Sequence, residues 1–193
     1  MTQYEALEIL KTGANVFLTG EPGSGKSHTI NEYVAYLRSH GIESAITAST
    51  GIAATHIGGM TIHSWSGIGI ADHLSEYEAM MIAARTKIRK RLAHARVLII
   101  DEVSMLSAAT LSMVDAVCRH GREIDMPFGG LQVVLVGDFF QLPPIARAGA
   151  RAAFACAADA WRVLNPVVCY LGEQYRQDDP QYLELLSALR ANR

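Results

Sequence analysis

The sequence predicts an α/β fold, a single lobe built on a parallel β-sheet with helices on both faces. Two observations predict it. Short, β-rich apolar runs with almost no polar alternation indicate strands that are covered on both sides. Longer segments with helical periodicity separate these runs, and this alternation is typical of βαβ units. The expected strands cover residues 15–19, 44–48, 97–100, 132–136 and 166–171.

The segments between these strands carry the apolar spacing of helices. The expected helices cover residues 4–12, 26–39, 75–92, 108–119, 152–160 and 181–190. Parallel strands all end at one edge of a sheet, and such sheets bind ligands beyond that edge. The residues that directly follow each strand are therefore expected to lie together and to carry the chemistry.

Composition limits the class of protein. The chain has 193 residues, half of them hydrophobic, which suits one domain over residues 1–193 with a real core. Its formal charge of −2 does not indicate a nucleic-acid binder and does not exclude one. Cys118, Cys156 and Cys169 form no C-x-x-C pair and are expected to be buried apolar residues in a reducing compartment. No signal peptide or membrane-spanning run is seen, so we expect a soluble, cytoplasmic protein with no membrane partner.

A glycine-rich loop, GEPGSGKS, follows the first strand and precedes a helix. It fits the pattern G-x-x-x-x-G-K-[ST] in the structural context that this pattern requires, although a glycine-rich turn can match by accident. The loop predicts a site for ATP, in which Lys26 reaches the β- and γ-phosphates and Ser27 binds Mg²⁺. The expected nucleotide-binding residues of the loop are Gly20, Pro22, Gly23, Ser24, Gly25, Lys26, Ser27 and His28.

Two adjacent carboxylates, Asp101 and Glu102, end the apolar run VLII. Alone they would equally suit the acidic first turn of a helix. Next to a phosphate-binding loop they favour hydrolysis. In that interpretation Asp101 holds Mg²⁺, and Glu102 is the general base for the attacking water.

The next strand ends in VGDFFQLPP, which brings Asp138 and Gln141 to the same edge. An amide both donates and accepts hydrogen bonds, so Gln141 could contact the attacking water and a γ-phosphate oxygen and sense the nucleotide state. Phe139 and Phe140 are expected to be core residues rather than a stacking surface. The proline pair that follows fixes the exit of the loop.

Five sequence blocks occur in an order that resembles a known family. The blocks are GEPGSGKS, TASTGIAATHIGGMTIHS, LIIDEVSML, PFGGLQVVLVGDFFQLPP and LGEQYRQ. They are similar to the first motor domain of superfamily-one 5′→3′ DNA helicases of the Pif and RecD type, and PFGG points to the Pif branch. The resemblance covers residues 15–177 and implies a RecA-like P-loop NTPase lobe. Two further expectations rest on the resemblance alone: the 5′→3′ direction of movement along DNA, and duplex or structured DNA as the substrate.

The resemblance also implies roles for single residues. Single-stranded DNA would contact the blocks TASTGIAA and TIHS, with candidate residues Thr50, Gly51, Thr61 and His63. His63 would equally suit a structural histidine, and Trp65 either a base-stacking surface or a core residue. Arg176 would stabilise charge on the γ-phosphate, although isolated surface arginines are common. Gln3 would read adenine.

Some features stay outside this assignment. Residues 67–96 match no motif, and the basic run KIRKRL within them suits a solvated helix face or a contact with nucleic acid. A helicase of this type needs a second lobe, which these 193 residues do not contain, so we expect a monomeric first lobe that hydrolyses ATP slowly and does not unwind DNA. The alternative is a P-loop ATPase switch that acts on a protein partner. The blocks TASTGIAA and TIHS favour the helicase.

Overall fold

The structure is a computed structural model that describes residues 1–144 and 152–173. Its centre is a six-stranded sheet in the order β3-β2-β4-β5-β1-β6, and every strand pair is parallel. The strands are β1 Val16–Gly20, β2 Ser44–Ala48, β3 Met60–Thr61, β4 Val97–Asp101, β5 Gln132–Val136 and β6 Val167–Leu171. The predicted parallel α/β fold is therefore confirmed, with the five expected strands within a residue or so of their predicted ends.

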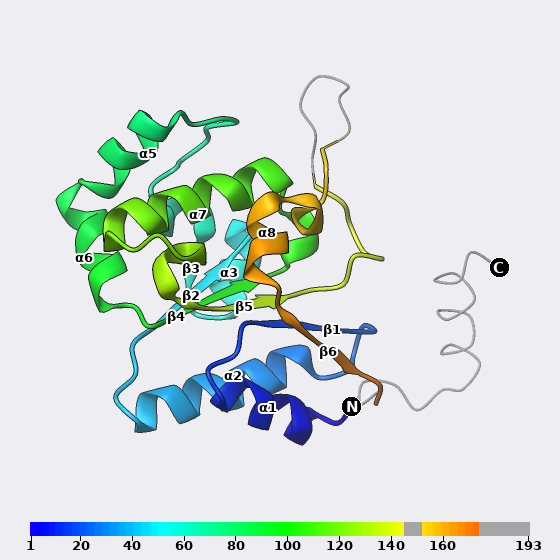
Figure 1. Ribbon diagram of the computed structural model, residues 1–193. Coiled ribbons are helices and arrows are strands. Elements are labelled where there is room, and N and C mark those ends of the chain that lie inside the picture. Colours follow the sequence, from blue (N-terminus) through cyan, green and yellow to red (C-terminus); the bar gives the residue numbers. More distant parts are fainter. Residues whose placement is uncertain (145–151, 174–193) are drawn as a thin grey trace.

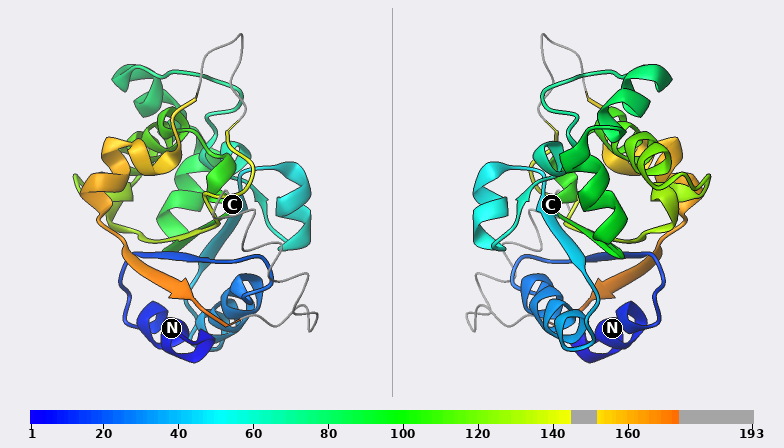
Figure 2. Two further views of the ribbon diagram at one scale, coloured as in Figure 1. Left: turned by 90° about the vertical axis from the view of Figure 1, so that its right-hand side faces the viewer. Right: turned by 90° about the vertical axis from the view of Figure 1, so that its left-hand side faces the viewer.

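Helices cover both faces of the sheet (Figures 1 and 2). The α-helices are α1 Gln3–Lys11, α2 Lys26–Ser39, α3 Gly51–His56, α4 Ile62–Ser66, α5 Glu76–Ala83, α6 Thr86–His94, α7 Ala108–Arg122 and α8 Asp159–Leu164. Short 3₁₀ turns are η1 Val103–Met105, η2 Pro127–Gly130 and η3 Ala155–Ala157. One cluster of buried residues packs α1 and α2 against one face of the sheet. A larger cluster packs the five helices α4, α5, α6, α7 and α8 against the opposite face. The central strands β1, β4 and β5 are thus buried on both sides, as their apolar runs predict.

The helix expected over residues 75–92 is two helices, α5 and α6, separated at Arg85. The buried residues explain the break. On one continuous helix, Ala83 would face opposite to Leu92, and Ile82 would lie about 120° away from Ile88, because each residue turns the helix by about 100°. All four are buried against the same core, so the break lets both halves face it.

Other expectations are corrected near the end of the described chain. Residues 152–160 do not form one helix: Phe154 pairs with Ser107 in an isolated bridge, and η3 and α8 follow. The helix expected at 181–190 lies outside the described residues. Cys118 and Cys169 are buried as predicted, whereas Cys156 is exposed, which contradicts its predicted burial. In the described part of the chain, no helix has the length and apolar character needed to cross a membrane.

The PFGG segment forms η2, a turn anchored to α7. Phe128 has a left-handed backbone (φ 52°) and a fully buried ring. Its N–H donates to Asp115 Oδ1 at 2.6 Å, and Arg122 Nε donates to Gly129 O at 2.6 Å. Arg122 also donates to the carbonyl oxygens of Leu92 and Ala95 at the end of α6. PFGG therefore joins α6, α7 and the start of β5.

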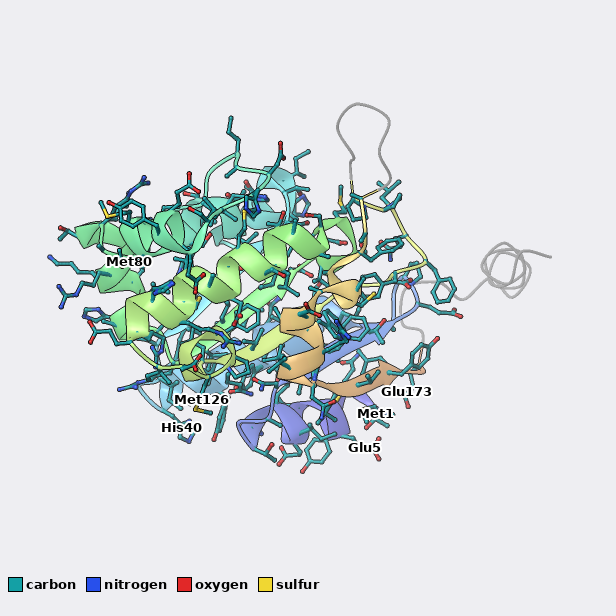
Figure 3. The ribbon with its side chains drawn as sticks, turned by 45° about the horizontal axis from the view of Figure 1, so that its top comes forward. Met1, Glu5, His40, Met80, Met126 and Glu173 are labelled. Carbon is teal, nitrogen blue, oxygen red and sulfur yellow. The ribbon has the colours of Figure 1, made fainter. Side chains whose placement is uncertain are left out.

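The first residue of the chain lies along the outer strand. The amino group of Met1 donates to Tyr170 O at 2.8 Å, and the N–H of Gly172 donates to Met1 O at 3.3 Å. Figure 3 shows Met1 beside Glu173 at the end of β6. These contacts hold α1 next to the phosphate-binding loop, because α1 begins two residues after Met1.

Candidate active site

The loop between β1 and α2 has the geometry of an anion-binding turn. Gly25 precedes α2 in a left-handed conformation (φ 87°), which only glycine adopts without strain, and no side chain caps the helix. A Cβ on Gly20 would lie 2.7 Å from Leu171 O and 2.7 Å from Ser24 Oγ. The first turn of α2 is thus left open towards the loop, where backbone N–H groups and the helix dipole favour a phosphate.

Two polar side chains of the loop are oriented for such a ligand. Lys26 Nζ donates to Gly20 O at 2.8 Å and to Glu21 O at 3.0 Å, so its ammonium group lies inside the loop. Ser24 Oγ is buried and has no hydrogen-bond partner among the described residues. A buried hydroxyl without a partner is costly, and a phosphate oxygen would satisfy it. Ser27, on the exposed first turn of α2, is accessible to a ligand.

The two carboxylates at the end of β4 lie beside this loop. Asp101 Oδ1 accepts the N–H of Glu102 at 2.9 Å. Burial raises the pKa of Asp101, and the N–H of Glu102 and the charge of Lys26 oppose the rise. Burial also raises the pKa of Glu102, repulsion from Asp101 and Asp138 adds to the rise, and Lys26 again opposes it. A carboxylate with a raised pKa is a better proton acceptor, as a general base requires.

Glu102 also has an unusual backbone. Its φ of 52° and ψ of 43° place it in the left-handed region, which costs a residue other than glycine roughly 1–3 kcal/mol. The strain is located at a candidate catalytic carboxylate rather than in a surface turn. This position re-aims the side chain away from the direction that strand alternation would give it.

The loop after β5 brings a third carboxylate to the same edge. Asp138 is 1% exposed, and its Oδ1 accepts the N–H of Phe140 at 3.1 Å. Its backbone oxygen accepts the N–H of Gln141 at 3.0 Å. The Gln141 amide lies 3.5 Å from Asp138 Oδ2 and is otherwise exposed, so it can turn towards a ligand. The sequence analysis placed Asp138 at this edge without a role; its burial shows that it orders the loop that carries Gln141.

The sheet order explains why these groups meet. β4, β5 and β1 are neighbours, and each ends at the same edge. The charges of Lys26, Asp101 and Asp138 all act on the pKa of Glu102, and the charge of Lys26 also acts on the pKa of Asp101, so these groups lie close together. Among residues 1–144 and 152–173, no group of three His, Cys, Asp or Glu side chains could hold a metal by itself. One carboxylate and one hydroxyl do fit Mg²⁺, which usually takes its other ligands from water and phosphates.

A pocket of about 320 Å³ lies between α1 and α2, next to the phosphate-binding loop. Gln3 Nε2 donates to Ser24 O at 3.3 Å, so the predicted Gln3 does lie at the site. Sequence reasoning missed the residues around it: Thr2, Tyr4, Leu7 and Thr29 line the pocket together with the predicted Gln3 and His28. Thr2 and Glu5 form a capping box that starts α1, and this T-x-x-E spacing could have fixed the first residue of the helix that was expected over residues 4–12.

The residues expected to contact DNA lie at the ends of β2 and β3. Thr50 caps α3, accepting from Ala53 N at 3.2 Å, and Thr61 caps α4, accepting from Ser64 N at 3.2 Å. The neighbouring strands align Ala48 with Thr61, so both caps share one edge of the sheet. Gly51 is exposed in the first turn of α3. These short helices escaped the sequence analysis because they are too short for a periodic pattern.

Three aromatic residues near these loops differ in how deeply they are buried. His63 is half-buried, and burial lowers its pKa. Trp65 is 4% exposed, so of the two readings the structure favours the core. Phe139 packs against Phe17, Phe154 and Trp161, as expected of a core residue.

Phe140 is 73% exposed, and its predicted burial is wrong. Phe139 and Phe140 are the two central residues of a turn closed by the bond from the N–H of Gln141 to Asp138 O, and only the first of the two rings reaches the core. Pro143 is exposed and Pro144 is buried where the loop leaves the edge of the sheet. Arg176, the expected γ-phosphate arginine, lies outside the described residues and stays a prediction.

Comparison with known proteins identifies similar sequences. The family model for PIF1-like helicases matches residues 3–184. A protein from Psychrobacter sp. (strain PRwf-1) named ATP-dependent DNA helicase Pif1 is 54% identical over 179 residues, which cover 92% of this chain and 27% of that protein. A Mus musculus protein named ATP-dependent DNA helicase PIF1 is 37% identical over 191 residues, which cover 99% and 29%. The chain thus spans less than a third of the length of these curated relatives.

Solved structures show the same fold. A crystal structure of Pif1 helicase from Candida albicans has a TM-score of 0.91 at 36% identity and covers 97% of this chain and 43% of that chain. A crystal structure of Pif1 helicase from Bacteroides in complex with ADP-AlF3 and ssDNA has a TM-score of 0.82 at 29% identity and covers 98% and 45%. Both likenesses extend over nearly all of this chain, and they confirm the predicted P-loop fold.

Proposed function

Because this chain belongs to the PIF1-like helicase family, we propose that it is the ATP-hydrolysing first lobe of a 5′→3′ DNA helicase. The observation that carries this proposal is the meeting of a phosphate-binding loop with carboxylates from two neighbouring strand ends. The named relatives are ATP-dependent DNA helicases, and one similar structure holds both ADP-AlF3 and ssDNA. Hydrolysis of ATP would drive translocation along single-stranded DNA and the unwinding of duplex or structured DNA.

We assign the nucleotide to the loop residues and to the pocket beside Gln3. The open first turn of α2 and Lys26 would bind the phosphates, and the unpartnered hydroxyl of Ser24 would donate to one phosphate oxygen. Gln3, on α1, would bind the base through its side-chain amide. Gly20, Pro22, Gly23, Gly25 and His28 would shape the walls of this site.

Hydrolysis would use the raised basicity of Glu102. Its carboxylate accepts a proton from the attacking water, while Lys26 balances negative charge on the γ-phosphate. Gln141 orients the same water, and Asp138 holds the Gln141 loop in place. Mg²⁺, when bound by Ser27 and Asp101, would neutralise phosphate charge in the transition state. Arg176 would supply a further positive charge.

Single-stranded DNA would lie along the edge of the sheet that carries Thr50, Gly51, Thr61 and His63. The hydroxyl groups of both threonines accept hydrogen bonds from backbone N–H groups, and each still has a proton to donate to a DNA phosphate. The nucleotide loop and this DNA edge share one side of the sheet, because β2 and β4 are neighbours. A change at the γ-phosphate therefore has a short path to the DNA.

We also propose that residues 1–193 form one motor lobe that works as a monomer beside a second lobe. The partial coverage of the relatives supports this division, since the whole match falls within one third of their length. Free thiols at all three cysteines suit a reducing cytosol.

The test is the rate of ATP hydrolysis by the full reading frame, with and without a single-stranded oligonucleotide. We expect stimulation by the oligonucleotide that is lost at high salt, because phosphate contacts release counterions. A Lys26→Met variant should lose both basal and stimulated turnover. Normal basal turnover without stimulation would contradict the helicase and favour the ATPase switch that acts on a protein.

A further inference from the structure

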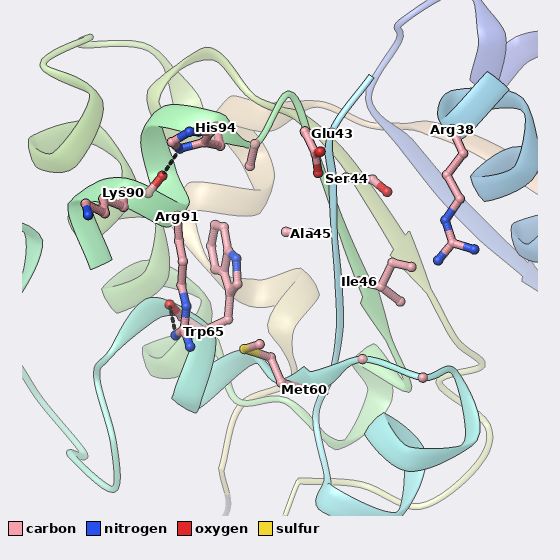
Figure 4. Close-up of a pocket in the computed structure, with 13 residues that line it drawn as sticks. Arg38, Glu43, Ser44, Ala45, Ile46, Met60, Trp65, Lys90, Arg91 and His94 are labelled. Atoms are coloured by element: carbon pink, nitrogen blue, oxygen red, sulfur yellow. Dashed lines mark hydrogen bonds between the residues drawn. The ribbon is translucent and has the colours of Figure 1, made fainter. Parts of the chain in front are cut away.

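A pocket of about 620 Å³ opens beside β2. It lies at the lateral edge of the sheet, where β3 and β2 are the outermost strands, and β4 and β5 separate it from β1 and the phosphate-binding loop. Neither the ATP site nor the proposed DNA edge uses it. It is bounded by the amino-terminal half of β2, by α4, by the end of α6 and by the end of α2 (Figure 4). Three properties of this pocket point to one kind of ligand: the open backbone edge of β2, the apolar floor and the positive charge of the rim.

The backbone of β2 is half unpaired at this edge. β4 pairs with all five residues of β2 on one side. On the other side, β3 pairs only with Thr47 and Ala48. Within the described part of the chain, Ser44 and Ala45 therefore have a strand partner on one side only, whereas Gly59 packs against the carbonyl group of Ile46. A strand edge of this kind can pair with an added extended chain.

The floor of the pocket is apolar. Ala45 contributes from β2 on the same side as Met60 and Trp65, whereas Ile46 lies on the other side of β2, towards Arg38 (Figure 4). Trp65 is 4% exposed and Met60 is 37% exposed. The floor is held rigidly, because Arg91 Nη1 donates to Ser64 O at 2.7 Å and to Trp65 O at 3.2 Å. An apolar side chain of a ligand would find a preformed surface here.

The rim is positively charged. Lys90 and Arg38 are exposed and lie on opposite sides of β2 (Figure 4). Neither side chain has a hydrogen-bond or ion-pair partner among residues 1–144 and 152–173. Glu43 is the one acidic residue of the lining, against Arg38, Lys90 and Arg91. Residues 85–96 carry six Lys or Arg and no Asp or Glu, although the whole chain has a formal charge of −2.

We propose that this pocket binds an extended, acidic segment of a partner protein. The segment pairs with the start of β2, at Ser44 and Ala45, as an added strand, its apolar side chains cover Met60 and Trp65, and its carboxylates meet Lys90 and Arg38. Single-stranded nucleic acid fits less well, because the indole of Trp65 is buried and offers no face for base stacking, and the imidazole of His94 is held against its own helix by a 2.6 Å contact of Nδ1 with Lys90 O. The proposal does not depend on ATP or DNA binding by this chain.

A peptide library tests this proposal. Ten-residue peptides of random order, rich in Asp, Glu and apolar residues, are displayed and selected against the wild-type chain. Binding of the enriched peptides is then measured by fluorescence anisotropy. We expect Lys90→Glu to weaken binding about tenfold or more. Lys87→Glu is the matched control: Lys87 lies on the same helix but outside the pocket, and its reversal should change affinity less than about twofold.

Two further comparisons separate strand pairing from simple charge attraction. Methylation of alternate backbone nitrogens in an enriched peptide should abolish binding, because it removes the donors that an added strand needs. Failure to enrich any peptide, equal effects of Lys87→Glu and Lys90→Glu, or unchanged binding after methylation would overturn the proposal. Loss of oligonucleotide binding in Lys90→Glu alone would assign the pocket to nucleic acid instead. Basal ATP hydrolysis should be unchanged in both variants, so failure here leaves the proposed function intact.

Discussion

Glu102 and Phe128 share a backbone conformation, with φ of 52° in both, that residues other than glycine seldom adopt. They lie in different environments. Phe128 belongs to the turn that joins α6, α7 and β5, and its ring is fully buried. Glu102 lies at the end of β4, half-buried, between two other carboxylates. The same strain therefore occurs once in the core and once in the candidate active site.

The compensation differs between the two positions. At Phe128, Asp115 accepts the backbone N–H at 2.6 Å, Arg122 holds the next carbonyl, and the ring contributes core packing. At Glu102, Asp101 accepts the N–H at 2.9 Å, but the side chain is only half-buried and its charge is unfavourable where it lies. Strain that its own side chain offsets serves the fold. Strain that its own side chain increases indicates function.

The largest effect is expected for Glu102→Gln. The amide keeps the size and the backbone but cannot accept the proton of the attacking water, so kcat should fall about 10³-fold or more. Nucleotide affinity, measured with a fluorescent analogue, should be retained. Glu123→Gln is the control, because Glu123 is an exposed glutamate that also has a left-handed backbone (φ 56°). Unchanged turnover in Glu102→Gln would remove Glu102 from the role of base.

Phe128→Gly should give the largest loss of stability. Glycine relieves the backbone strain, but the variant leaves a cavity where a ring was fully buried. The cavity outweighs the relief, so we expect the free energy of unfolding to fall by about 3–4 kcal/mol in urea titration. A neutral or stabilising result would mean that packing does not offset the strain at this position, and the contrast with Glu102 would be lost.

Asp115→Asn should cost somewhat less, about 2 kcal/mol, because a weaker acceptor would face the N–H of Phe128 and the guanidinium of Arg119. ATP hydrolysis per folded molecule should be unchanged. Asp125 contacts the same arginine but is almost fully exposed. Asp125→Asn should therefore have no measurable effect in the same titration. Equal losses in the two variants would show that the ion pairs, rather than the bond to Phe128, hold the turn.

The same contrast explains how much the sequence could predict. The phosphate-binding loop and the carboxylates after β4 follow from local patterns, since a fixed spacing of glycine, lysine and serine defines the loop and an uninterrupted apolar run defines each central strand. The break at Arg85 and the opposite fates of Phe139 and Phe140 depend on which core each side chain reaches. No local pattern contains that information, because tertiary packing decides it.

The left-handed backbone of Glu102 and the half-open edge of β2 were also beyond sequence reasoning. A glutamate in a strand-to-turn junction has no sequence signal for positive φ, unlike a glycine. The open edge exists because β3 is two residues long and pairs only with Thr47 and Ala48. Both features to which we assign a function thus lie where local preference and the observed structure disagree.

A smaller effect tests the strain at Glu102 directly. Glu102→Gly should stabilise the chain by about 1 kcal/mol or less, because relief of the left-handed backbone and of carboxylate repulsion exceeds the entropy that glycine adds to the unfolded chain. Turnover should be lost as in Glu102→Gln. Phe128→Gly should change stability in the opposite direction, although Phe128 has the same left-handed backbone conformation as Glu102. A destabilised Glu102→Gly variant would show that the carboxylate contributes to the fold after all.

The smallest effect concerns pH at the edge proposed to bind DNA. Burial lowers the pKa of His63 in the folded chain below its ordinary value near 6.5. The unfolded chain then binds the proton more readily, so the folded state should lose stability as pH falls through that value towards the lowered pKa. Thermal unfolding of wild type and His63→Gln at pH 7.5 and pH 5.5 should show a greater loss for wild type. The difference should be below about 1 kcal/mol, because the ring keeps some contact with water. If wild type instead gained stability at pH 5.5 relative to His63→Gln, a partner that favours the charged ring would outweigh burial, and His63 would be prepared to meet a phosphate even without DNA.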